Sequence, residues 1–140
     1  MLLPNTQDLK ALFDRIRTIA VVGAKDVPGQ PVDMVGRYLL ENGFNVIPVH
    51  PKRQNIWGVT TYPSLTDVPE PVDMVNVFRA PQFCPQHARE TLELQSRPSV
   101  FWMQLGIVSP EAEEILTPQG IQVIQNECLM VVHKRVKGQA

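Results

Sequence analysis

An apolar run that ends in a glycine stands near the N-terminus of the chain: Ile19-Ala20-Val21-Val22-Gly23-Ala24-Lys25. Continuous apolar runs rich in β-branched residues are typical of strands buried on both faces of a parallel sheet. A helical pattern follows within a dozen residues, starting near Pro31. The turn between such a strand and the next helix is where α/β proteins bind phosphates, because backbone N–H groups and the helix dipole face the anion there. This junction therefore narrows the question to which phosphate-bearing ligand, if any, the chain binds.

Four further apolar segments are interpreted as strands, and amphipathic helical patterns separate them. The predicted strands are residues 18–22, 44–49, 72–78, 99–104 and 121–124, and the predicted helices are residues 8–16, 31–42, 84–94 and 111–116. Residues 129–136 fit a helix or an extension of the last strand, and we favour the helix. Alternating strands and helices predict right-handed crossovers. The predicted fold class is α/β, a Rossmann-like three-layer sandwich with a mostly parallel five-stranded sheet, strand order 3-2-1-4-5 and helices on both faces.

Composition and charge narrow the classes of partner. The chain has 140 residues, 44% of them hydrophobic and 19% charged, with a net charge of −1. We expect a single domain over residues 1–140 that binds neither nucleic acid nor membrane, because there is no basic excess and no apolar run of about 18 residues. Cys84 and Cys128 have no disulfide or metal-site spacing, so a cytoplasmic protein with reduced thiols and no metal is expected.

The first turn and the end of the second strand argue against NAD. A dinucleotide fingerprint needs G-x-G-x-x-G after the first strand and an acidic residue at the end of the second. Here Gly23 is followed by Ala24-Lys25, and the second strand ends in His50-Pro51-Lys52-Arg53. A basic corner favours a nucleotide with an extra ribose phosphate, and NADP and coenzyme A both qualify. Alternatively, Lys52 and Arg53 are solvated loop charges.

Several segments, in chain order, carry a family resemblance. They are residues 21–24 (VVGA), 35–39 (VGRYL), 45–51 (NVIPVHP), Gly58 with 62–65 (YPSL), 72–79 (VDMVNVFR), 102–106 (WMQLG) and 120–124 (GIQVI) leading to Cys128. They cover nearly the whole chain. The chain thereby resembles the stand-alone CoA-binding family, relatives of the nucleotide-binding domain of the succinyl-CoA synthetase alpha subunit. The resemblance implies a Rossmann-like fold that binds coenzyme A.

The resemblance also implies roles for individual residues. Gly23, Ala24 and Lys25 match the loop that approaches the CoA phosphates. Pro51 and Lys52 match the segment that borders the adenosine and its ribose phosphate, and Phe78 and Arg79 match the pair that faces the cleft. Gln104 and Gly106 match the loop near the path from pyrophosphate to pantetheine. His50 is a further candidate for phosphate contact. The chain departs from the family at Lys25, where Ser or Thr is common, and at His50, where Asn is common.

Structural interpretations compete with these roles. Gly23 could serve only a tight turn, and Arg79 could pair with a carboxylate such as Asp73 or Asp67. Trp102, inside an apolar strand, is interpreted as a core residue. His50 could also be a merely exposed loop histidine.

No catalytic set is visible, because no nucleophile has a base at a recognised spacing. In the synthetases that the chain resembles, the phosphorylated histidine and the ligase machinery lie in further domains. The predicted function is therefore a non-catalytic module that binds coenzyme A or an acyl-CoA through its pyrophosphate and ribose phosphate. One alternative is a small NADP-linked reductase, for which Tyr38 and Tyr62 lack a suitably spaced lysine. Another is an interaction protein that has kept the fold and lost the ligand. The sequence leaves open whether the chain binds a protein partner or forms a weak homo-oligomer.

Overall fold

The computed structural model describes residues 3–138, and its elements follow the predicted alternation. The strands are β1 (Thr18–Val22), β2 (Asn45–Val49), β3 (Met74–Val77), β4 (Val100–Met103) and β5 (Gln122–Ile124). The helices are α1 (Thr6–Arg15), α2 (Pro31–Glu41), α3 (Cys84–Glu93), α4 (Pro110–Leu116) and α5 (Leu129–Lys137), and the short 3-10 turns are η1 (Ile56–Gly58), η2 (Leu65–Asp67), η3 (Pro81–Phe83) and η4 (Thr117–Gln119). All paired strands run parallel, which confirms the α/β class. The segment after β5 is a helix, as favoured.

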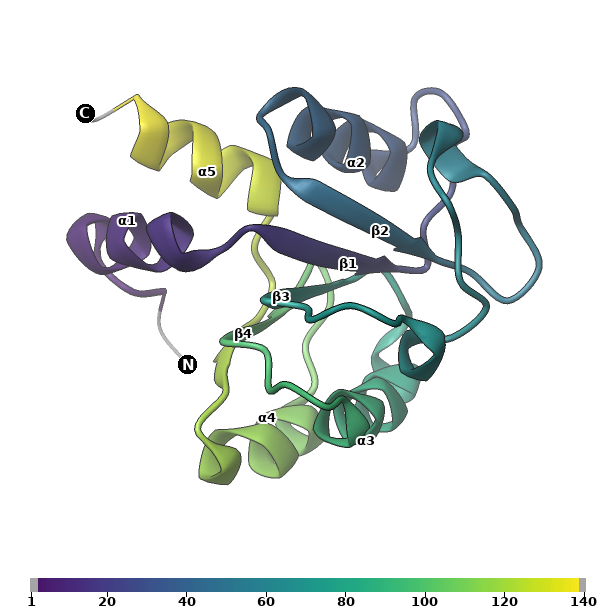
Figure 1. The fold of residues 1–140 in the computed structure, drawn as a ribbon. Helices are drawn as coiled ribbons and strands as arrows, with labels where there is room; N and C mark the ends of the chain where they lie inside the picture. The colour runs from purple at the N-terminus through teal and green to yellow at the C-terminus, as the bar shows by residue number, and fades with distance from the viewer. Residues whose placement is uncertain (1–2, 139–140) are drawn as a thin grey trace.

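The strand order in the sheet is β2-β1-β3-β4-β5, so the predicted order 3-2-1-4-5 is wrong (Figure 1). The chain moves from β1 to β2 in one direction and returns past β1 to reach β3. A right-handed crossover in the reverse direction must pass over the opposite face of the sheet. Val35 of α2 accordingly packs on one face, whereas Leu65 and Val68 of the β2–β3 connection pack on the other. The order reverses between β1 and β3, and not between β1 and β4.

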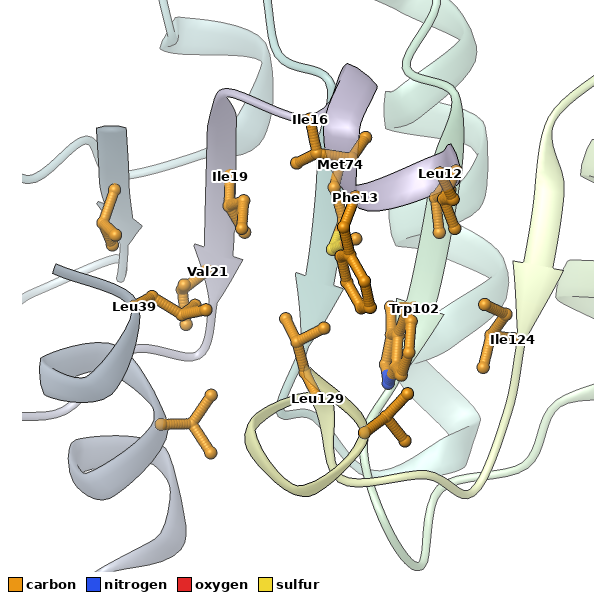
Figure 2. Packing of buried hydrophobic residues seen from close by; sticks show 14 of the residues in the cluster. Leu12, Phe13, Ile16, Ile19, Val21, Leu39, Met74, Trp102, Ile124 and Leu129 are labelled. Carbon is orange, nitrogen blue, oxygen red and sulfur yellow. The ribbon is translucent and has the colours of Figure 1, made fainter. Parts of the chain in front are cut away.

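Two apolar clusters sandwich the sheet. One lies under α1, α2 and α5, and the other lies under α3 and α4 (Figure 1). All five residues of β1 are buried, as expected of a central parallel strand covered on both faces. Trp102 is fully buried, and its ring centroid lies 6.1 Å from that of Phe13 in the first cluster (Figure 2). The interpretation of Trp102 as a core residue is confirmed.

Three aromatic rings surround His133 of α5 where this helix packs against α1 and α2. Its ring makes edge contacts with Phe13, Tyr38 and Phe44, and its Nδ1 lies 2.6 Å from the Tyr38 hydroxyl. Burial, followed by the charge of Lys137, lowers the pKa of His133 below 6.5. The fold therefore favours the neutral imidazole.

We expect the free energy of unfolding to fall on acidification. A histidine whose pKa is lower in the folded state stabilises the fold above the unfolded-state pKa of 6.5, and this stability is lost as the pH falls through the folded-state value. Urea titrations at about pH 7.5 and 5.5 measure the difference. His133→Asn should flatten the dependence without abolishing it, since burial and nearby cations also lower the pKa of His50. Stability that rises on acidification would contradict the assignment.

Candidate functional site

A cleft of about 450 Å³ opens at the carboxyl ends of β1, β3 and β4, beside the N-terminus of α2. Its volume falls within the range of roughly 300–1,000 Å³ that is usual for small-molecule sites. The reversal of strand order between β1 and β3 is where α/β sheets bind ligands. Six of the predicted site residues line this cleft together: Gly23, Lys25, Phe78, Arg79, Gln104 and Gly106.

Gly23 allows the turn after β1 to approach the end of β3. Its φ is +83°, and an added Cβ would lie 2.4 Å from the carbonyl oxygen of Phe78. The backbone N–H groups of Gly23 and Ala24 donate to the Val49 carbonyl at 3.0 and 3.2 Å. Ala24 is fully buried. The N–H groups of this turn therefore hold the end of β1 to β2. The missing side chain of Gly23 leaves room for the backbone that follows β3.

Side chains supply the donors that remain for a ligand. The N–H of Gly106 donates to Asn126 Oδ1 at 2.7 Å, which pins the loop after β4. Gln104 is buried and accepts the Leu129 N–H on its Oε1 at 3.3 Å, so its Nε2 is left as the donor. Gln104, together with Lys25 and Arg79, therefore brings side-chain donors to the cleft.

Arg79 is the cation with the most distinctive surroundings. Its Nε is buried and has no hydrogen-bond partner within residues 3–138, and its guanidinium lies 4.3 Å from the Phe83 ring centroid. The two carboxylates proposed as its partners are occupied elsewhere. Asp73 accepts from the N–H groups at the start of β1, and Asp67 accepts from the Ser64 hydroxyl. Arg79 is therefore available to an anionic or polar ligand.

Charged groups converge on the corner after β2. His50 Nδ1 accepts the N–H groups of Lys52 and Arg53 at 3.1 and 3.0 Å. Burial lowers the pKa of His50, and the charges of Arg53, Lys25, Arg79 and Lys52 lower it further. A neutral His50 thus shapes this turn. His50 and Lys52 line neither the cleft nor the second cavity described below.

A buried carboxylate on α2 holds the connection that follows β2. Asp33 is 4% exposed and accepts from Trp57 Nε1 at 2.8 Å and from Arg37 Nε at 2.9 Å. The Trp57 ring covers Gly36, where an added Cβ would overlap it, and Trp57 itself has a φ of +55°. Non-glycine residues rarely adopt this conformation. These contacts fix the connection after β2 beside the cleft.

A second cavity of about 170 Å³, which the sequence did not predict, adjoins the cleft on the α3 side of the sheet. It shares Gly23 and Arg79 with the cleft, and Pro51 lines it. His87 and Glu90 also line it, and His87 Nδ1 lies 2.7 Å from Glu90 Oε1. Their i, i+3 spacing within one predicted helix was the available signal.

Three side chains of types used in catalysis, Cys84, Ser64 and Tyr38, are engaged elsewhere or masked by burial. Burial raises the pKa of the Cys84 thiol to about 11, with Arg79 opposing the shift. The Ser64 hydroxyl donates to Asp67. The Tyr38 hydroxyl contacts His133. Burial raises the pKa of the Tyr38 hydroxyl. Within residues 3–138, no group of three or more His, Cys, Asp or Glu side chains could hold a metal ion, and no helix there is long and apolar enough to cross a membrane.

A parallel sheet with a ligand-sized cleft at the reversal of its strand order, lined by Lys25 and Arg79, is the arrangement in which α/β proteins bind nucleotides. Residues 17–134 match the model of the CoA binding domain family. The chain belongs to this family.

Two relatives match nearly the whole chain, and a third matches part of it. The Bacillus subtilis protein YneT is 37% identical over 134 residues, which are 96% of this chain and 98% of YneT. A Thermus thermophilus structure, ID.343, is 43% identical with a TM-score of 0.88, covering 95% of this chain and 99% of that one. The ADP-forming acetate–CoA ligase II of Archaeoglobus fulgidus is 33% identical over 81 residues, which are 56% of this chain and 12% of the ligase.

Proposed function

We propose that the chain is a single-domain, non-catalytic module that binds coenzyme A or an acyl-CoA in the cleft between β1 and β3. Arg79 carries this proposal, since its buried Nε has no partner in the described residues while its side chain lines the cleft. Buried polar groups are nearly always hydrogen-bonded, and guanidinium groups bind phosphates well. The residues present therefore fit the charged part of coenzyme A.

The other parts of coenzyme A are assigned to further residues along the cleft. Lys25 and Arg79 bind the pyrophosphate, and Phe78, Gln104 and Gly106 contact the pantetheine arm. Lys52 binds the ribose phosphate at the basic corner. Arg53 is the weaker candidate there because its guanidinium lies 3.5 Å from the Asp26 carboxylate. The similarity to one segment of an acetate–CoA ligase, which spans 12% of that enzyme, agrees with a ligand-holding role.

Coenzyme A should raise the melting temperature, and dephospho-CoA should raise it less. A ligand at about 100 times its dissociation constant stabilises the native state by roughly 2.7 kcal/mol, or about 5–10 °C for a domain of this size. Thermal-shift measurements with both ligands test the cleft and the basic corner together. Lys52→Ser should remove the difference between the ligands, whereas Lys10→Ser on α1 should preserve it.

Equal shifts from both ligands would remove the assignment of Lys52 to the ribose phosphate. Absence of any shift at millimolar coenzyme A would overturn the binding proposal. Acetyl-CoA recovered intact after prolonged incubation would support the non-catalytic role, and steady turnover would refute it.

A further inference from the structure

The carboxyl edge of the sheet divides into a cationic half and a half without cations. The connections that follow β1, β2 and β3 contain Lys25, Lys52, Arg53 and Arg79. Residues 98–132, which include β4, β5 and the segments that follow them, contain no lysine or arginine, and the charged residues among them are all glutamates. The cleft spans both halves, since it is lined by residues from the ends of β1, β3 and β4. The phosphates of a ligand are therefore expected on the first half, and an uncharged part of the ligand on the second.

Exposed apolar side chains are concentrated on the half without cations. Five large apolar side chains are exposed within residues 3–138, and three of them, Leu105, Val108 and Val131, follow β4 or β5. Leu105 is the most exposed of the five, at 67%, and it lines the cleft together with Ile107. Apolar residues exposed singly are ordinary, whereas an exposed apolar surface that continues a cleft is typical of a binding site.

A hydrogen-bonded turn fixes Leu105 in its exposed position. The Ile107 N–H donates to the Gln104 carbonyl at 2.9 Å, and Gly106 has a φ of +87° at the third position of this turn. Asn126 holds the turn from the segment after β5, because its Oδ1 accepts the Gly106 N–H and its own N–H donates to the Ile107 carbonyl. Such a turn needs glycine at its third position but accepts a polar residue at its second. Neither the turn nor the core therefore requires leucine at position 105, which points to a contact outside the chain.

We propose that the ligand is an acyl-CoA with an uncharged, apolar acyl group, which lies on the turn after β4 against Leu105 and Ile107. This rests on the proposed function, in which the ribose phosphate, the pyrophosphate and the pantetheine arm follow the sheet from β2 past β1 and β3 to β4. The thioester is at the far end of the pantetheine arm, so the acyl group reaches the segment where apolar side chains are exposed. A terminal carboxylate would lose hydration there without gaining a cationic partner.

The test measures the affinities of acetyl-, butanoyl-, hexanoyl- and succinyl-CoA by isothermal titration calorimetry. Full burial of a methylene group corresponds to about a fourfold gain in affinity. An open turn covers about half of the group, so affinity should rise about twofold per methylene and roughly 10- to 20-fold from acetyl-CoA to hexanoyl-CoA. Succinyl-CoA has as many acyl carbons as butanoyl-CoA but should bind no more tightly than acetyl-CoA.

Variants of Leu105 test the position of the acyl group. Leu105→Ser should bring the affinities for hexanoyl-CoA and acetyl-CoA close together, and using their ratio cancels any effect on the shared part of the ligand. Leu105→Lys should reverse the order of butanoyl-CoA and succinyl-CoA, because an exposed ion pair then favours the carboxylate. Met34→Ser is the matched control, since it removes a half-exposed apolar side chain from α2 and should keep the wild-type ratio.

The outcomes separate this proposal from the proposed function. If coenzyme A binds but acyl length has no effect, if succinyl-CoA binds most tightly, or if Leu105→Ser keeps the preference for hexanoyl-CoA, the acyl site is wrong and the cleft assignment stands. If coenzyme A does not bind, S-acetyl- and S-hexanoyl-pantetheine, which lack the nucleotide, are compared instead. A preference for the hexanoyl compound that Leu105→Ser abolishes would support the acyl site on its own, and absence of a preference would overturn it.

Discussion

Gly23→Ala should destabilise the fold far more than Gly29→Ala, although both glycines have positive φ values, of +83° and +88°. A left-handed alanine costs about 1–2 kcal/mol at either position. At Gly23 the new Cβ would also lie 2.4 Å from the Phe78 carbonyl oxygen, whereas nothing lies within 4 Å at Gly29. Overpacking against backbone adds roughly 1–3 kcal/mol. The expected losses are about 2–5 kcal/mol for Gly23→Ala and about 1–2 kcal/mol for Gly29→Ala.

Urea denaturation of both variants measures this difference directly. The effect of replacing glycine on the entropy of the unfolded chain is nearly the same for the pair, so it cancels in the comparison. Equal destabilisation would mean that the turn after β1 has room for a side chain. In that case the glycine would not be needed for the approach of β1 to β3.

The strands could be predicted because each is buried on both faces and bounded by turn residues. The order of the strands in the sheet could not be predicted, because it depends on the path of residues 50–73. This connection contains η1 and η2 but no α-helix to show by its periodicity which face it covers. Ile56 packs with the α2 side and Leu65 with the α3 side, so the connection crosses between layers. A local pattern does not reveal such a crossing.

The grouping of Gly23, Arg79 and Gln104 was predictable since the carboxyl ends of parallel strands meet at one edge of a sheet. The hydrogen-bond partners of the site residues were not predictable. The sequence predicted first-turn N–H groups for phosphate, but Val49 accepts those of Gly23 and Ala24. The pairing of His87 with Glu90 beside a cavity depends on how α3 docks against the sheet.

Arg79→Met should weaken coenzyme A binding by roughly 10- to 100-fold without lowering the melting temperature of the free protein. Hydrogen bonds to charged groups contribute about 1.5–3 kcal/mol, and each 1.4 kcal/mol is a tenfold change in affinity. The Arg79 Nε is buried and has no hydrogen-bond partner among residues 3–138, so its removal relieves an unfavourable group. The lost contact with the Phe83 ring opposes this gain by about 0.5–1 kcal/mol.

Calorimetric titration and thermal unfolding of the same samples give the two readouts. Arg89→Met is the matched control, because that guanidinium is 60% exposed and contacts Glu111 on the surface, and it should change neither affinity nor stability appreciably. Arg79→Lys keeps the charge but loses the planar fork, so its affinity should lie between wild type and Arg79→Met. A large loss of stability in Arg79→Met with unchanged affinity would make Arg79 a structural residue. The opposite pattern, weaker binding in an equally stable protein, is what a side chain held ready for a ligand requires.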